Sequence, residues 1–238
     1  MEQLHWLAVV RHGLSTGNVT AQDAETSGAE LIDIPERDAD VPLAPAGREQ
    51  AEAVGHLLAA NRPGLAVVSP YLRTRQTAEI ALGDSGVPVV VDERLRDREL
   101  GVLDLLTARG VQARLPDEAR RRERLGKFYY RPPGGESWAD VLLRLRALLR
   151  EIREDHPGGR VVLFAHEATV LMVRYLIEHL SEAELMDLAR GVTIANCSMS
   201  TWHGDGGPLR PELFNSVDHL HRHDAPPTRQ EDVNAEPV

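Results

Sequence analysis

The stretch Leu7-Ala8-Val9-Val10-Arg11-His12-Gly13 decides how this sequence of 238 residues folds. Its apolar half predicts a buried strand, and an arginine, a histidine and a glycine follow directly. An arginine and a histidine at the end of a buried strand can form an anion pocket that contains a nucleophile. An imidazole that attacks phosphorus forms a covalent intermediate, which divides one difficult displacement into two easier steps. By itself, the tripeptide Arg11-His12-Gly13 fits equally well a histidine that merely ends a strand.

The length and composition are typical of one large α/β domain or of two small ones. Hydrophobic residues make up 42% of the chain, which is enough for a proper core. The single cysteine, Cys197, excludes an intrachain disulfide and offers no cysteine-based zinc site. The first residues lack the pattern of a signal peptide, and no run reaches the roughly 18 apolar residues of a membrane helix. We therefore expect a cytoplasmic protein. The bias towards arginine and alanine indicates a GC-rich bacterial genome.

The formal net charge of −10 argues against nonspecific binding to nucleic acid. An anionic substrate must therefore meet a local basic pocket. The sequence has neither a phosphate-binding Walker loop nor a dinucleotide-binding glycine motif. His219, His221 and His223 alternate, but no carboxylate or cysteine pattern completes a metal site around them. We expect no cofactor, no metal, and no nucleic-acid or membrane partner. Association into a homodimer stays open.

Apolar patterns along the chain predict alternating strands and helices. The expected strands are 4–10, 65–68, 87–91, 160–165 and 198–203, and the expected helices are 45–60, 73–82, 139–154, 167–179 and 182–189. This order indicates a mostly parallel sheet covered by helices on both faces. We expect one domain over 1–215, with an arginine-rich helical cap over 92–136. Residues 216–238 are expected to form a poorly ordered tail.

Polar residues follow four of the expected strands. They are Arg11-His12-Gly13, the segment 69–78 that contains Ser69 and Arg73, the segment 95–101 that contains Asp97 and Glu99, and His166-Glu167. Because the carboxyl ends of parallel strands meet at one edge of a sheet, these groups should converge there.

In this order, the motifs resemble those of the histidine phosphatase superfamily, also called the phosphoglycerate mutase-like family. The resemblance covers roughly residues 4–203. Its anchors are Arg11-His12-Gly13, Ser69-x-x-x-Arg73-x-x-x-Thr77-Ala78, Gly134-Gly135-Glu136-Ser137, His166 and Asn196-Cys197-Ser198. The resemblance implies a three-layer α/β sandwich of the phosphoglycerate mutase-like type, with a helical cap insertion. It also implies a phosphomonoester hydrolase that acts on a small phosphorylated metabolite. The alternatives are a cofactor-dependent phosphoglycerate mutase and a noncatalytic phosphate-binding regulatory protein.

The resemblance further implies the roles of individual residues. His12 would be the nucleophile that becomes phosphohistidine. Arg11 and Arg73 would bind the phosphoryl oxygens, which suits the planar, two-pronged donor geometry of arginine. His166 would donate to the same oxygens, and Asn18 would contact the phosphate.

The general acid is less directly indicated. In the family a glutamate stands four residues before a glycine, and here Asp97 takes that position before Gly101. Glu99, two residues further on, remains an alternative acid. Both carboxylates could instead form salt bridges with nearby arginines, namely Arg94, Arg96 and Arg98.

Three further departures from the family pattern bear on function. Leu14 stands where a polar residue is frequent, which weakens the match to the glycolytic mutases. Glu167 follows His166 where glycine is usual, so it either holds that histidine protonated or begins the next helix. The acidic insertion 20–41 is expected to line or cover the opening of the site, where its charge would disfavour highly anionic substrates.

Overall fold

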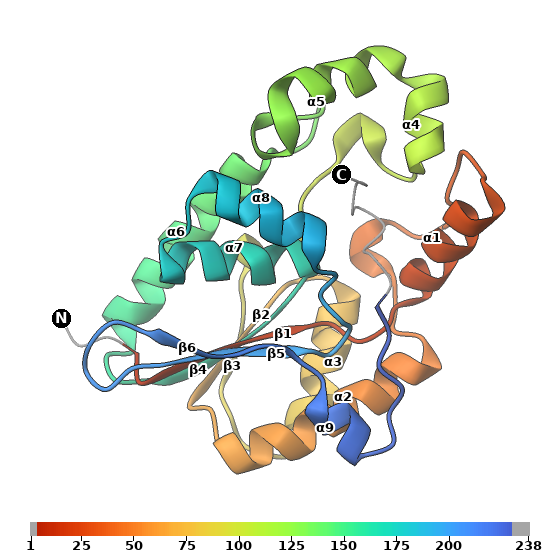
Figure 1. Cartoon of the computed structure of the whole chain (residues 1–238). Helices are drawn as coiled ribbons and strands as arrows, with labels where there is room; N and C mark the ends of the chain where they lie inside the picture. Colours follow the sequence, from red (N-terminus) through yellow and green to blue (C-terminus); the bar gives the residue numbers. More distant parts are fainter. Residues whose placement is uncertain (1–3, 230–238) are drawn as a thin grey trace.

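The computed structural model describes residues 4–229 and shows a six-stranded sheet between two layers of helices (Figure 1). The strand order is β3-β2-β4-β1-β5-β6. The strands are β1 (Trp6–Arg11), β2 (Leu65–Val68), β3 (Val89–Val91), β4 (Arg160–Ala165), β5 (Met199–His203) and β6 (Arg210–Ser216). The first four pair in parallel, β5 pairs antiparallel with β1, and β6 pairs antiparallel with β5. Among the described strands, β5 therefore runs against the other five, in agreement with the mostly parallel sheet that the sequence predicts.

Alternate side chains of the strands enter two separate apolar cores. Leu7 and Val9 point into the core on one face, and Ala8 and Val10 into the core on the other. The first core is covered by α6 (Trp138–Asp155), α7 (Glu167–Glu178) and α8 (Glu182–Gly191), and the second by α2 (Pro45–Asn61), α3 (Leu72–Leu82) and α9 (Asp218–Arg222). No helix within residues 4–229 is long and apolar enough to cross a membrane.

Two insertions extend the fold beyond the sheet and its covering helices, although Leu95 and Phe128 of the second insertion pack into the first core. The first holds α1 (Thr16–Ser27) and the 3-10 turn η1 (Asp38–Asp40), and the second holds η2 (Glu93–Leu95), η3 (Gly101–Leu103), α4 (Ala108–Arg114) and α5 (Pro116–Tyr129). Each has a small apolar cluster of its own, around Ala24 and Ile32 in the first and around Leu103 and Tyr130 in the second. The insertions contact each other, since the Thr107 hydroxyl donates to the Ala29 carbonyl over 2.6 Å.

The C-terminal region differs from the expected disordered tail over residues 216–229. Helix α9 packs on α2, with Leu220 fully buried, and the Gln50 side chain donates to the Pro226 carbonyl over 2.7 Å. The Asn196 amide donates to the Thr228 carbonyl over 3.0 Å. This segment is fixed by a few buried side chains and backbone hydrogen bonds, which leave no periodic pattern in the sequence. Residues 230–238 of the predicted tail lie outside the described residues.

Helix α2 approaches the loop after β1 so closely that only glycine fits between them. A Cβ atom on Gly47 would lie 2.1 Å from the Leu14 carbonyl oxygen, and one on Gly13 would lie 2.4 Å from the Gly47 carbonyl oxygen. Both neighbouring atoms belong to the backbone, so neither can move aside without shifting the helix.

We therefore expect Gly47→Ala to lower the free energy of unfolding by about 1 to 3 kcal/mol, the usual cost of overpacking. Urea unfolding measures this change. Gly191→Ala is the matched control, because a Cβ at the end of α8 would meet no atom within 4 Å. Equal effects of the two substitutions would show that the contact between Gly13 and Gly47 is not tight.

The buried His219 of α9 makes the stability of the fold depend on pH. Its buried Nε2 lies 2.9 Å from the Cys197 carbonyl oxygen, which can only accept, so Nε2 carries the proton. Burial lowers the pKa of His219 below its ordinary value. Because the pKa of His219 is lower in the folded protein than in the unfolded chain, the neutral histidine stabilises the fold. This contribution to the free energy of unfolding is fully present above the pKa of the unfolded histidine, about 6.5, and is lost as the pH falls below it.

We expect the free energy of unfolding to fall between about pH 7 and about pH 5, and to fall less in His219→Gln. Glutamine keeps a donor for the Cys197 carbonyl but does not titrate. Urea unfolding at each pH measures the difference between the two proteins. Identical pH profiles would contradict the role of His219.

Candidate active site

His12 follows β1 directly and is completely buried. Its Nδ1 lies 2.8 Å from the carbonyl oxygen of Gly13. Because a carbonyl oxygen can only accept a hydrogen bond, Nδ1 carries the proton and the lone pair resides on Nε2. The backbone thus fixes the tautomer that an attack through Nε2 requires.

The loop that carries His12 is held by side chains of α2 and α3. The amide of Gly13 donates to the Thr77 hydroxyl over 3.0 Å, and the amide of Leu14 donates to the Gln50 side-chain oxygen over 2.9 Å. Both partners are buried polar residues. The sequence predicts neither role, although Thr77 stands within a motif that the sequence singles out.

The turn before β5 holds His12 from the other side. The Cys197 amide lies within hydrogen-bond distance of two carbonyls, that of Arg11 at 3.1 Å and that of His12 at 3.2 Å. Cys197 reaches them with a φ of 52°, in the left-handed region that residues other than glycine rarely adopt. The side-chain amide of Asn196 also donates to the His12 carbonyl, over 3.3 Å.

Asn18, the predicted phosphate contact, lies in the first turn of α1. Its side-chain oxygen accepts from the backbone amide of Ser15 at 3.1 Å, and its own backbone amide donates to the Ser15 hydroxyl oxygen over 3.0 Å, so that the two residues form a capping box. The Ser15 hydroxyl also donates to the Asn18 side-chain oxygen, over 2.9 Å. Asn196 Nδ2 lies 3.5 Å from the same oxygen. The Asn18 oxygen therefore orients the residue, and its Nδ2 is the end that can donate to an anion.

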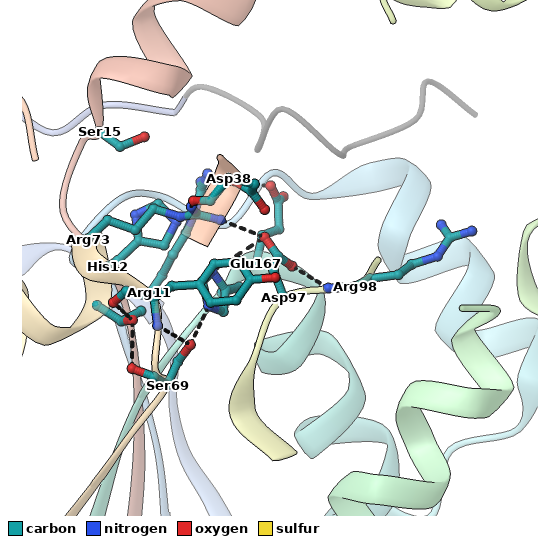
Figure 2. Close-up of polar contacts among 12 residues, drawn as sticks. Arg11, His12, Ser15, Asp38, Ser69, Arg73, Asp97, Arg98 and Glu167 are labelled. Carbon is teal, nitrogen blue, oxygen red and sulfur yellow. Dashed lines mark hydrogen bonds and ion pairs between the residues drawn. The ribbon is translucent and has the colours of Figure 1, made fainter. Parts of the chain in front are cut away.

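Asp97 lies in the turn after β3 and contacts one residue that follows β2 and one that follows β4 (Figure 2). Its Oδ2 lies 3.2 Å from Nη2 of Arg73 and 3.3 Å from Nδ1 of His166. All three side chains are at most 4% exposed. The other ring nitrogen of His166, Nε2, lies 2.8 Å from the Ser69 hydroxyl. The ring centroids of His12 and His166 are 5.3 Å apart, so the Asp97 carboxylate contacts a histidine that packs against the candidate nucleophile.

Glu99, the alternative acid, lies further out. Its residue is exposed, and its carboxylate accepts a hydrogen bond from the Tyr71 hydroxyl over 3.1 Å. The neighbouring arginines bind elsewhere: Arg94 pairs with Asp92 and Glu151, Arg96 pairs with Glu136, and Arg98 donates to the Glu136 carbonyl. The Arg98 side chain points away from the site in Figure 2.

Glu167 begins α7 and lies on the Arg11 side of the site. Its Oε2 is 3.7 Å from Nη1 of Arg11, and its Oε1 accepts from the Ile194 amide over 3.1 Å. The buried Arg11 guanidinium also donates to the Ile194 carbonyl. The structure thus favours the interpretation that Glu167 begins a helix, and it places Asp97 as the carboxylate on His166.

Arg73 also pairs with a second carboxylate, that of Asp38, which the sequence does not predict. Its Nη1 donates to both the carbonyl oxygen and the carboxylate Oδ1 of Asp38, over 2.7 and 2.8 Å. The Tyr71 ring centroid lies 4.9 Å from the Arg73 Cζ. Burial raises the pKa of the Tyr71 phenol, and so do the charges of Asp38, Asp97 and Glu99, so the hydroxyl stays protonated. Asp38 belongs to the insertion that the sequence places at the opening of the site.

Comparison with solved structures places this arrangement of sheet, cap insertion and strand-end histidines in the class of histidine phosphatase-fold proteins. A mycobacterial glucosyl-3-phosphoglycerate phosphatase in complex with VO3 superimposes with a TM-score of 0.72 at 28% identity, covering 90% of this chain and 100% of that one. The sequence matches the histidine phosphatase superfamily (branch 1) over residues 7–217, and the chain belongs to this family. The predicted family and fold are thereby confirmed.

Relatives in this family include both mutases and phosphatases. A probable phosphoglycerate mutase, GpmB, of Yersinia enterocolitica is 30% identical over 195 residues, which is 81% of each chain. A glucosyl-3-phosphoglycerate phosphatase of Mycolicibacterium vanbaalenii is 35% identical over 154 residues, which is 61% of this chain and 59% of that protein.

Proposed function

We propose that the protein is a metal-independent phosphatase that hydrolyses a small phosphorylated metabolite through a phosphohistidine. The observation that carries this proposal is the bond from His12 Nδ1 to the Gly13 carbonyl, which leaves Nε2 as the nucleophilic nitrogen. Buried cationic and imidazole groups beside it supply what a phosphoryl anion requires. The kinship to named phosphatases supports hydrolysis.

In the first step, His12 Nε2 attacks phosphorus. A P–N bond forms while the bond between phosphorus and the ester oxygen breaks. Arg11, Arg73 and His166 stabilise the phosphoryl oxygens, and Asn18 Nδ2 can add a further donor. Asp97 protonates the departing alkoxide, and the negative charge of the bound phosphoryl group favours the protonated form of that carboxyl group beforehand.

In the second step, the Asp97 carboxylate takes a proton from water, whose oxygen attacks phosphorus. The P–N bond breaks, the electron pair returns to His12 Nε2, and inorganic phosphate leaves. Asp97 thus regains the proton that it gave to the alcohol, so the cycle needs no metal and no cofactor.

A cofactor-dependent phosphoglycerate mutase is the second candidate, and the relatives that carry this name favour it. It would use the same pocket but return the phosphoryl group to a phosphoglycerate. Leu14 and the acidic insertion 20–41 count against it. A noncatalytic phosphate-binding protein is the third candidate, and the intact set of phosphate-pocket residues counts against that.

We expect His12→Ala to lower kcat for p-nitrophenyl phosphate by about a thousandfold or more, because the nucleophile is lost. Acid-labile ³²P-phosphoprotein, trapped by rapid quench during turnover, should disappear as well. His221→Ala, an exposed histidine in α9, is the control and should retain both signals.

Full activity of His12→Ala would refute the mechanism. Under the same conditions, conversion of 3-phosphoglycerate to 2-phosphoglycerate without phosphate release would establish the mutase. The absence of any labelled protein across a panel of phosphate esters would favour the binding protein.

We expect the effect of Asp97→Asn to depend on the leaving group. Hydrolysis of an alkyl ester such as glycerol 3-phosphate needs the acid and should fall by about a hundredfold or more. Hydrolysis of p-nitrophenyl phosphate, whose phenolate leaves without a proton, should fall much less. Steady-state kcat/KM for both substrates measures the difference.

Glu99→Gln is the matched substitution at the rival carboxylate and should affect both substrates alike. The reverse result, with the leaving-group dependence at Glu99, would identify Glu99 as the acid. Equal losses for both substrates in Asp97→Asn would mean that Asp97 only positions Arg73 and His166.

A further inference from the structure

Asp38 contacts the same arginine as the proposed acid. Arg73 contacts Asp97 through Nη2 and Asp38 through Nη1, so both carboxylates lie against one guanidinium. Figure 2 shows Asp38 above Arg73 and Asp97. If Asp97 protonates the leaving oxygen, the first atoms of the alcohol lie close to this guanidinium and therefore close to Asp38.

The same side carries further negative charge. The Tyr71 ring lies against His166, with centroids 5.1 Å apart, and its hydroxyl reaches the Glu99 carboxylate. Asp104 follows η3, and its pKa is raised by partial desolvation of the carboxyl group and then by the charges of Asp38 and Glu99. The charges of Asp38 and Glu99 therefore both act on the Asp104 carboxyl group.

We propose that Asp38 sets the charge preference of the site, which takes phosphate esters of uncharged or cationic alcohols and discriminates against alcohols that carry a carboxylate or a second phosphate. This inference rests on the proposed phosphatase function and specifies its substrate class. An anionic alcohol would lie close to Asp38 in a partly buried site, where like charges repel more strongly than in water.

Asp38 has two effects on the substrate in this proposal: its charge repels an anionic alcohol, and its contacts position Arg73. Nη1 of Arg73 donates both to the Asp38 carbonyl and to the Asp38 carboxylate. The variant Asp38→Asn would keep a side-chain oxygen as the acceptor for Arg73 and remove only the charge. This variant therefore separates repulsion from the positioning of Arg73.

The test compares glycerol 3-phosphate with 3-phosphoglycerate, which share one carbon skeleton and differ by a hydroxymethyl group in place of a carboxylate. O-phosphoethanolamine adds a cationic alcohol. We expect kcat/KM for glycerol 3-phosphate to exceed that for 3-phosphoglycerate by about tenfold or more, as one unscreened like charge near the site predicts. O-phosphoethanolamine should not be disfavoured. Consumption of each substrate is followed, so that isomerisation is counted with hydrolysis.

In Asp38→Asn the ratio should fall to about threefold or less, mainly because kcat/KM for 3-phosphoglycerate rises. Asp40→Asn is the matched control. Asp40 belongs to the same turn, but its exposed carboxylate pairs with Arg37 over 2.7 Å, so the ratio should stay that of the native protein. Added salt should reduce the native ratio, because it screens the repulsion.

The outcomes separate this inference from the proposed function. If p-nitrophenyl phosphate is hydrolysed through phosphohistidine but 3-phosphoglycerate is used as well as glycerol 3-phosphate, the charge preference is wrong and the phosphatase stands. An unchanged ratio in Asp38→Asn would also refute the role of Asp38. If no ester is hydrolysed and no phosphohistidine forms, the proposed function itself fails.

Discussion

The arrangement of the site depends on the contacts of the Asp97 carboxylate with Arg73 and His166. Burying a charged group costs several kcal/mol unless it is paired, and removing one member of a buried pair typically costs about 3 to 5 kcal/mol. Here one oxygen faces a guanidinium and an imidazole that come from two other segments of the chain. The ends of β2 and β4 and the turn after β3 are thus bound to a common point, beside the loop that carries His12.

Most of the central fold was predictable because its elements carry strong local patterns. Strand β2 and helix α6 show the apolar run and the helical spacing that a buried strand and an amphipathic helix require. Helix α1 was not predicted, because its buried positions are small or polar residues. The helix depends on the Ser15 capping box at its start and on contacts with Ile32 and with Leu105 of the second insertion. Strand β6 was missed as well: it is an edge strand with largely exposed side chains, and its pairing with β5 is irregular.

The candidate site was predictable to the extent that strand ends determine it. His12, Arg73 and His166 follow strands, so the parallel order alone brings them together. Which of Asp97 and Glu99 contacts Arg73 and His166 needed the structure, because the turn after β3 is irregular and residues two apart in it do not share a side. Asp38 lies 35 residues from Arg73 along the chain, and its contact depends on the path of an insertion that no sequence pattern specifies.

The two insertions have small apolar clusters of their own, around Tyr130 and around Ile32, although Leu95 and Phe128 of the second insertion also pack into the first core. A change of side chain within either small cluster therefore disturbs little of what holds the sheet together. Arg11, His12, Arg73 and His166, which are proposed to form and hold the phosphoryl group, sit on the sheet and its helices, while Asn18, Asp38, Asp97 and Asp104 sit on the insertions. Such a division lets a lineage exchange one alcohol for another by altering surface segments, while the nucleophile and the groups that hold the phosphoryl oxygens are inherited unaltered.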